Sequence, residues 1–79
     1  MKNRITEMLG WYGVVVIVTA YVLLSFDVFT SKSFIYQILN FTGAIGIMVD
    51  ALDDKDYQPV VLNLIWAVVA LVALFRIFF

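Results

Sequence analysis

The sequence predicts an all-α membrane protein, a bundle of three transmembrane helices at about residues 8–28, 33–51 and 58–78. Hydrophobic residues make up 65% of its 79 residues, whereas soluble domains hold about 45–50% apolar residues. Charged residues fall almost wholly between three apolar runs, each close to the ~20 residues that cross a bilayer. A chain this short cannot bury so much apolar surface by itself. We therefore expect a single domain over residues 1–79 that lies in the lipid bilayer.

Charge and residue types narrow the possible functions. The net charge is −1 and the bases form no cluster, so nucleic acid is not an expected partner. The chain has no Cys and no His, which excludes thiol chemistry, the usual zinc ligands and imidazole catalysis. The spans also hold no pair of acids. We expect neither an enzyme nor a cofactor or metal site.

The first apolar run is Met8–Phe26, which follows a polar lead over Met1–Glu7. Trp11 and Tyr12 near its start are suited to the membrane interface. Small residues at Val18–Ala20 also fit a signal-peptide cleavage site. Because the run continues to Phe26 without a break, we expect a retained helix instead, although it shows no clean stripe for packing.

A short turn, Asp27–Lys32, leads to the second run. Ser31 or Ser33 is a candidate N-terminal cap of the helix that follows. Asp27 and Lys32 lie at the wrong ends of their helix dipoles, so we expect them to pair with other groups. The run Ser33–Val49 holds eight Leu, Ile, Val or Phe residues against eleven in the third run. The middle helix is therefore the least stable in lipid alone and depends most on its neighbours.

The third run, Tyr57–Phe75, follows the acidic turn Ala51–Gln58. The turn lacks the spacing of a calcium-binding loop, so it is interpreted as a solvated loop. Pro59 fits a first helical position, and Arg76 after the run can extend its charge to the membrane interface.

Polar and small residues share one side of the middle helix at about 100° per residue, with Ile35, Ile38, Phe41, Ile45 and Val49 on the other. An amide without a partner in hydrocarbon is costly, so the polar side should face protein or a wet cavity. In the third helix Asn63 shares a side with Ala67, Ala70 and Ala73. Two interpretations remain open: helix–helix hydrogen bonds, or the path of a polar solute. The candidates for such a substrate path are Tyr36, Gln37, Asn40, Gly43, Asn63 and Trp66.

Three charged residues are candidates for a gate or an interfacial ion pair. Asp27 and Arg76 end up at the same membrane surface and are predicted to pair, closing the first helix on the third. Asp50 continues the polar side of the middle helix at the opposite surface, where it can form a gate or pair with Arg4.

Four blocks carry a resemblance to a known family: Gly10–Gly13, Tyr21–Ser25, Tyr36–Ala44 and Pro59–Ala67. With these blocks the chain resembles a family of short bacterial three-helix membrane proteins of unknown function, which implies a membrane location and no particular activity. More distantly, the layout is similar to the three-helix half-transporters of the semi-SWEET and PQ-loop kind, which pair to enclose a substrate. Gln58-Pro59 reverses the dipeptide of that group and lies in a loop.

Two functions follow as expectations. The first is a homodimeric half-transporter for a small polar solute, and the alternative is a structural or accessory subunit of a larger membrane complex. A holin-like pore is a third idea, which the absence of a charged tail disfavours. We expect a bacterial inner (cytoplasmic) membrane location. Lys2, Arg4 and Lys55 on one side against Lys32 and Arg76 on the other favour a cytoplasmic N-terminus.

Overall fold

The computed structural model describes residues 4–79, which form three helices and no strand. These are α1 (Arg4–Ser25), α2 (Phe34–Asp53) and α3 (Tyr57–Phe78). Each is long and apolar enough to cross a membrane, so the predicted fold class is confirmed. The helix ends lie within four residues of the predicted ones, and the largest difference is that α1 begins at Arg4. Lys2, which the orientation argument used, lies outside the described residues.

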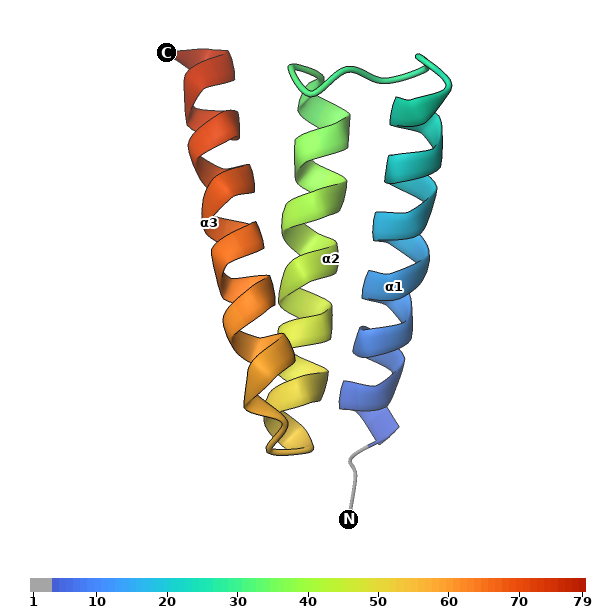
Figure 1. The fold of residues 1–79 in the computed structure, drawn as a ribbon, viewed down its shortest axis with the longest axis vertical. Coiled ribbons are helices and arrows are strands. Elements are labelled where there is room, and N and C mark those ends of the chain that lie inside the picture. The colour runs from blue at the N-terminus through green and yellow to red at the C-terminus, as the bar shows by residue number, and fades with distance from the viewer. Residues whose placement is uncertain (1–3) are drawn as a thin grey trace.

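The three helices form one layer with α2 in the middle (Figure 1). Within the described chain α2 contacts both neighbours, whereas α1 and α3 do not contact each other. Every residue from Tyr36 to Ala51 is consequently buried or half-buried. On the apolar side of α2 only Ile35 is exposed and the rest is half-buried, so the neighbouring helices cover part of that side as well.

Backbone contact between glycines brings α1 and α2 together. A Cβ atom at Gly13 would overlap the carbonyl oxygen of Gly43, and one at Gly46 would overlap that of Leu9. Small residues allow this close approach, which strengthens van der Waals packing in lipid. The stripe of α1 that faces α2, which the sequence analysis missed, consists of Gly10, Gly13, Ile17 and Ala20.

Small residues and amides pack α3 on α2. The predicted inner side of α3 is confirmed for Asn63, Ala67 and Ala70, which are buried. Ala73 is only half-buried, and Leu74 is buried instead. At the far end of this contact the rings of Phe34 and Phe78 meet edge to face, with centroids 5.4 Å apart.

Both turns between helices have a residue in the left-handed conformation, two residues after the helix ends. Asp27 has φ 64° and donates its N–H to the carbonyl of Leu24 at 3.1 Å. Lys55 has φ 57° and donates to Leu52 at 3.1 Å. In each turn the next N–H bonds to a carbonyl five residues back, which completes the Schellman arrangement that ends a helix. The position of Asp27 thus has a backbone role that the sequence analysis did not predict.

The helix starts match the sequence less closely. Ser33 is the N-cap of α2, as predicted, yet its side chain makes no capping hydrogen bond. Pro59 is the third residue of α3, not the first. Its missing N–H costs nothing there, because the first four N–H groups of a helix have no acceptor within it.

Candidate functional site

Three amide side chains are buried in the α2–α3 contact. Gln37, Asn40 and Asn63 are 8%, 5% and 8% exposed. Asn40 and Asn63 each donate to the carbonyl four residues earlier in their own helix, at 3.1 Å to Tyr36 and 2.8 Å to Pro59. Gln37 donates to the carbonyl of Ser31 at 2.7 Å. The backbone thus supplies each buried amide with an acceptor that lipid does not offer.

A hydrogen bond links the middle helix to α3 through Trp66. Its indole Nε1 donates to Oδ1 of Asn40 at 3.3 Å. Asn40 therefore uses both ends of its amide, the nitrogen toward its own helix and the oxygen toward α3. The ring of Trp66 remains 49% exposed and lies at the surface of the layer.

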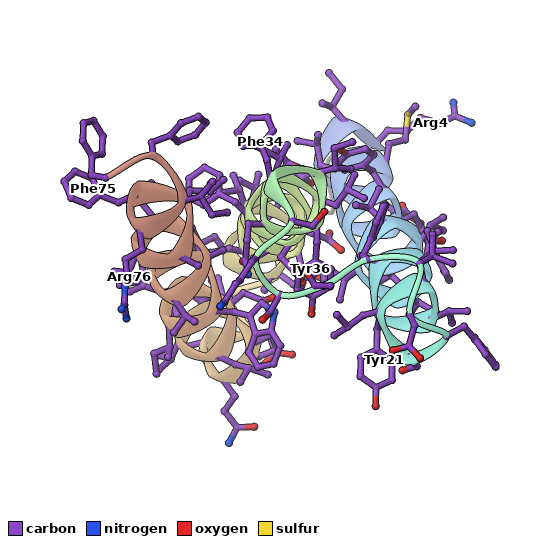
Figure 2. The ribbon with its side chains drawn as sticks, turned by 90° about the horizontal axis from the view of Figure 1, so that it is seen from above. Arg4, Tyr21, Phe34, Tyr36, Phe75 and Arg76 are labelled. Carbon is purple, nitrogen blue, oxygen red and sulfur yellow. The ribbon has the colours of Figure 1, made fainter. Side chains whose placement is uncertain are left out.

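Two open grooves adjoin at Trp66. One of about 310 Å³ lies between α2 and α3, where Tyr36, Gln37 and Asn40 line it. The other, of about 270 Å³, has walls from all three helices and includes Asn63. Tyr36 extends from α2 in the direction opposite to Phe34, so these grooves lie on one side of the layer (Figure 2). The structure therefore brings together five of the six predicted path residues: Tyr36, Gln37, Asn40, Asn63 and Trp66.

Gly43, the sixth predicted path residue, lies away from these grooves. It faces α1, and a Cβ atom there would overlap the side chain of Ile17. Its position explains the need for a small residue by helix packing rather than by contact with a solute.

Asp50 lies on the α1 side of the middle helix. Its carboxylate covers Gly10, where a Cβ atom would overlap it, and it lines an open groove of about 230 Å³ with Trp11. Arg4 points away from α2 (Figure 2), so the predicted Arg4–Asp50 pair does not form within the chain. One polar link at this end comes from Thr6, whose hydroxyl donates to Asp53 at 2.7 Å.

The predicted Asp27–Arg76 pair does not form within the chain either. The helices that carry these residues lie on opposite sides of α2 and do not touch. Arg76 instead lines a groove of about 630 Å³ with Lys32 and Gln37. The sequence analysis placed all three charges at one surface but did not predict which helices are neighbours.

Comparison with known proteins gives one match. The model of one small, uncharacterised family matches residues 6–79, nearly the whole chain. No curated protein and no solved structure matches, so the likeness to half-transporters stays a prediction. In residues 4–79, no three His, Cys, Asp or Glu side chains come together as metal ligands.

Proposed function

We propose that this chain, which belongs to the small uncharacterised family whose model matches it, is a packing subunit of a larger membrane assembly. The observation that carries the proposal is the bonding of the buried amides. Gln37, Asn40 and Asn63 each donate to a carbonyl of the chain itself. Amides whose N–H groups are bonded within their own chain can be buried in a helix contact, and they have less capacity left to bind a solute.

The arrangement of exposed surface supports the same proposal. The middle helix is covered on both flanks, whereas large apolar residues of α1 and α3 are exposed along most of their lengths. A single layer whose outer helices do not touch has no interior in which to enclose a route. Its faces suit contact with lipid and with other membrane helices, either of a second copy or of a different protein.

A half-transporter is the second candidate, favoured by the two grooves that adjoin at Trp66. They gather amide and aromatic side chains from the spans on one side of the layer. A second copy that faced this side would turn the open grooves into an enclosed path. A polar solute would then bond to the amide oxygen of Asn63, or replace Trp66 at the amide oxygen of Asn40.

Thiol labelling in this Cys-free chain separates the two candidates. Asn40→Cys and Ile65→Cys place thiols in the groove between α2 and α3, and the second leaves every amide intact. Val68→Cys is the lipid-facing control, and Thr30→Cys, at an exposed loop position that lines neither groove, is the exposed control. The variants are reconstituted in vesicles and treated with a charged maleimide.

For a packing subunit, the two groove thiols label as slowly as Val68→Cys, because thiols in hydrocarbon ionise poorly and meet little reagent. For a water-filled path, they label within about tenfold of the Thr30→Cys rate. Fast labelling of Ile65→Cys alone would already contradict the packing proposal, because that variant disturbs no buried hydrogen bond.

We also propose a bacterial cytoplasmic membrane location with the N-terminus in the cytoplasm. The basic residues support it, with Lys2, Arg4 and Lys55 on one side of the spans and two on the other. In spheroplasts, whose cytoplasmic membrane is intact, Ser31→Cys should react with a membrane-impermeant maleimide and Lys55→Cys should not. The reverse pattern would invert the orientation.

A further inference from the structure

A groove with two basic residues opens at the end of the α2–α3 contact. This basic groove is lined by Ser31, Lys32, Gln37, Ala73, Arg76 and Ile77 and has a volume of about 630 Å³. Lys32 comes from the loop before α2 and Arg76 from the last turn of α3. No acidic residue lines it, so its electrostatic field attracts anions.

The basic groove lies where a lipid headgroup would be. The loop between α1 and α2 and the C-terminal end of α3 occupy the same end of the layer (Figure 1). Helices α2 and α3 diverge toward that end. Phenylalanine rings gather at the same end of the layer: Phe34 packs on Phe78, and Phe75 lies 4.7 Å from Phe79 between ring centroids. The groove thus places its cations at the edge of an apolar span.

A buried hydrogen bond holds the groove in shape. The amide of Gln37, only 8% exposed, donates to the carbonyl of Ser31 at 2.7 Å. This bond fixes the loop against α2 one residue before Lys32. The opposite wall is helical, so the two cations come from backbone segments whose separation is set by the fold.

Around the basic groove, positive charge is not balanced by nearby carboxylates. Asp27 is the only acidic side chain in the segment between α1 and α2, and it lies at the end of α1, on the far side of α2 from Arg76. The other acids, Glu7 and the aspartates of residues 50–56, belong to the opposite end of the layer. Neither Lys32 nor Arg76 therefore has a carboxylate partner within its groove.

We propose that the basic groove binds the phosphate of an anionic phospholipid. Arg76 presents a planar pair of N–H donors that fits two phosphate oxygens, and the Lys32 ammonium donates from the loop side. Ala73 and Ile77 give the lipid's acyl chains an apolar wall. The inference stands whether the chain is a packing subunit or a half-transporter, because the two cations of the basic groove, Lys32 and Arg76, line neither of the grooves at Trp66.

Native mass spectrometry of the full chain in detergent tests this inference. Phosphatidylglycerol and phosphatidylcholine with the same acyl chains are added in equal amounts, and the bound lipid is counted. The unaltered protein should retain phosphatidylglycerol preferentially. Lys32→Gln/Arg76→Gln should lose about tenfold or more of that preference, since two cations near a lipid surface act together. Lys55→Gln, at the opposite end, is the matched control and should keep it.

A conservative variant, a folding check and a competition with inorganic phosphate complete the experiment. Arg76→Lys should retain most of the preference by charge, and helical circular dichroism of every variant checks that it is folded. Equal binding of the two lipids by the unaltered protein, or an undiminished preference in the folded double variant, would overturn the inference. Release of bound phosphatidylglycerol by millimolar inorganic phosphate would overturn the lipid as the source of the phosphate.

Discussion

The two helix contacts of this layer consist of different types of residue. Between α1 and α2, Gly13 and Gly46 let backbone approach backbone, and two hydrogen bonds between exposed side chains, Thr6 with Asp53 and Tyr12 with Thr42, cross the contact. Between α2 and α3, alanines pack around three buried amides, and Trp66 reaches Asn40 with its indole N–H. Both contacts involve the same middle helix, so they differ in chemistry while the surroundings stay the same.

The difference shows two ways to hold helices together in lipid. Hydrocarbon chains are as apolar as leucine, so burial of apolar side chains supplies little force between membrane helices. In the α1–α2 contact the hydrogen bonds join exposed side chains, so dispersion at the closely approaching glycines, which an added side chain disrupts, is the main attraction. The α2–α3 contact has a part-buried hydrogen bond of modest strength, which single substitutions weaken without blocking the fit.

The largest effect is expected from Gly13→Leu. The new side chain would meet the carbonyl oxygen of Gly43 and the side chain of Ile47, and a helix backbone cannot move aside cheaply. We expect a loss of about 3 kcal/mol in the free energy of unfolding, at the high end for an overpacked site. Circular dichroism during titration with sodium dodecyl sulfate measures it.

Thr19→Leu provides the control for this substitution. Thr19 lies on the exposed side of α1, so the same increase in size should change the free energy of unfolding by less than about 0.5 kcal/mol. If Gly13→Leu were as mild as Thr19→Leu, the close α1–α2 contact would not exist in the membrane.

A smaller effect is expected at the α2–α3 contact. A double-mutant cycle of Asn40→Leu and Trp66→Phe isolates the hydrogen bond that joins these residues at 3.3 Å. Hydrogen bonds between membrane helices contribute about 0.6 kcal/mol on average and up to about 1.7. We expect a coupling energy within that range, measured by the same titration.

Trp11 on α1 supplies the matched control. It is 64% exposed, and Trp11→Phe combined with Asn40→Leu should give additive effects because the two residues lie on different sides of α2. A zero coupling energy for Asn40 with Trp66 would show that alanine packing alone holds α3, and the two contacts would then rest on the same principle.

The sequence predicted the spans and the central role of the polar helix well. The lengths of the apolar runs predicted the three helices. The helical rotation of about 100° per residue placed Gln37 and Asn40 on the same side of α2. Asn63 and its alanines were grouped on α3 in the same way. Periodicity succeeds here because a buried amide in lipid needs a partner, which limits where its side of the helix can point.

Which helices are neighbours, and the glycine contact between α1 and α2, were harder to predict from the sequence. The predicted Asp27–Arg76 pair assumed that the outer helices touch, and nothing in the pattern of one helix shows which two others flank it. The stripe of α1 was missed because polarity was followed instead of side-chain size. The matching spacings of Gly10 with Gly13, and of Gly43 with Gly46, were the available signal.

The two turns between the helices can be compared in the same way, and here the smallest change in the free energy of unfolding is expected. Each turn has one left-handed residue, Asp27 before α2 and Lys55 before α3. A left-handed conformation costs an L-residue about 1–2 kcal/mol, but aspartate tolerates it better than lysine does. Glycine removes this cost while adding about 0.5–1 kcal/mol of chain entropy to be lost on folding.

Lys55→Gly should therefore stabilise the protein by about 0.5 kcal/mol, the difference between the strain relieved and the entropy added. Asp27→Gly, at the matching position of the other turn, should change the free energy of unfolding by less, because less strain is present to relieve. Paired titrations of the two variants measure the difference directly. Destabilisation by Lys55→Gly would mean that the lysine side chain makes a contact worth more than its backbone strain, and the two turns would then differ as much in chemistry as the two helix contacts do.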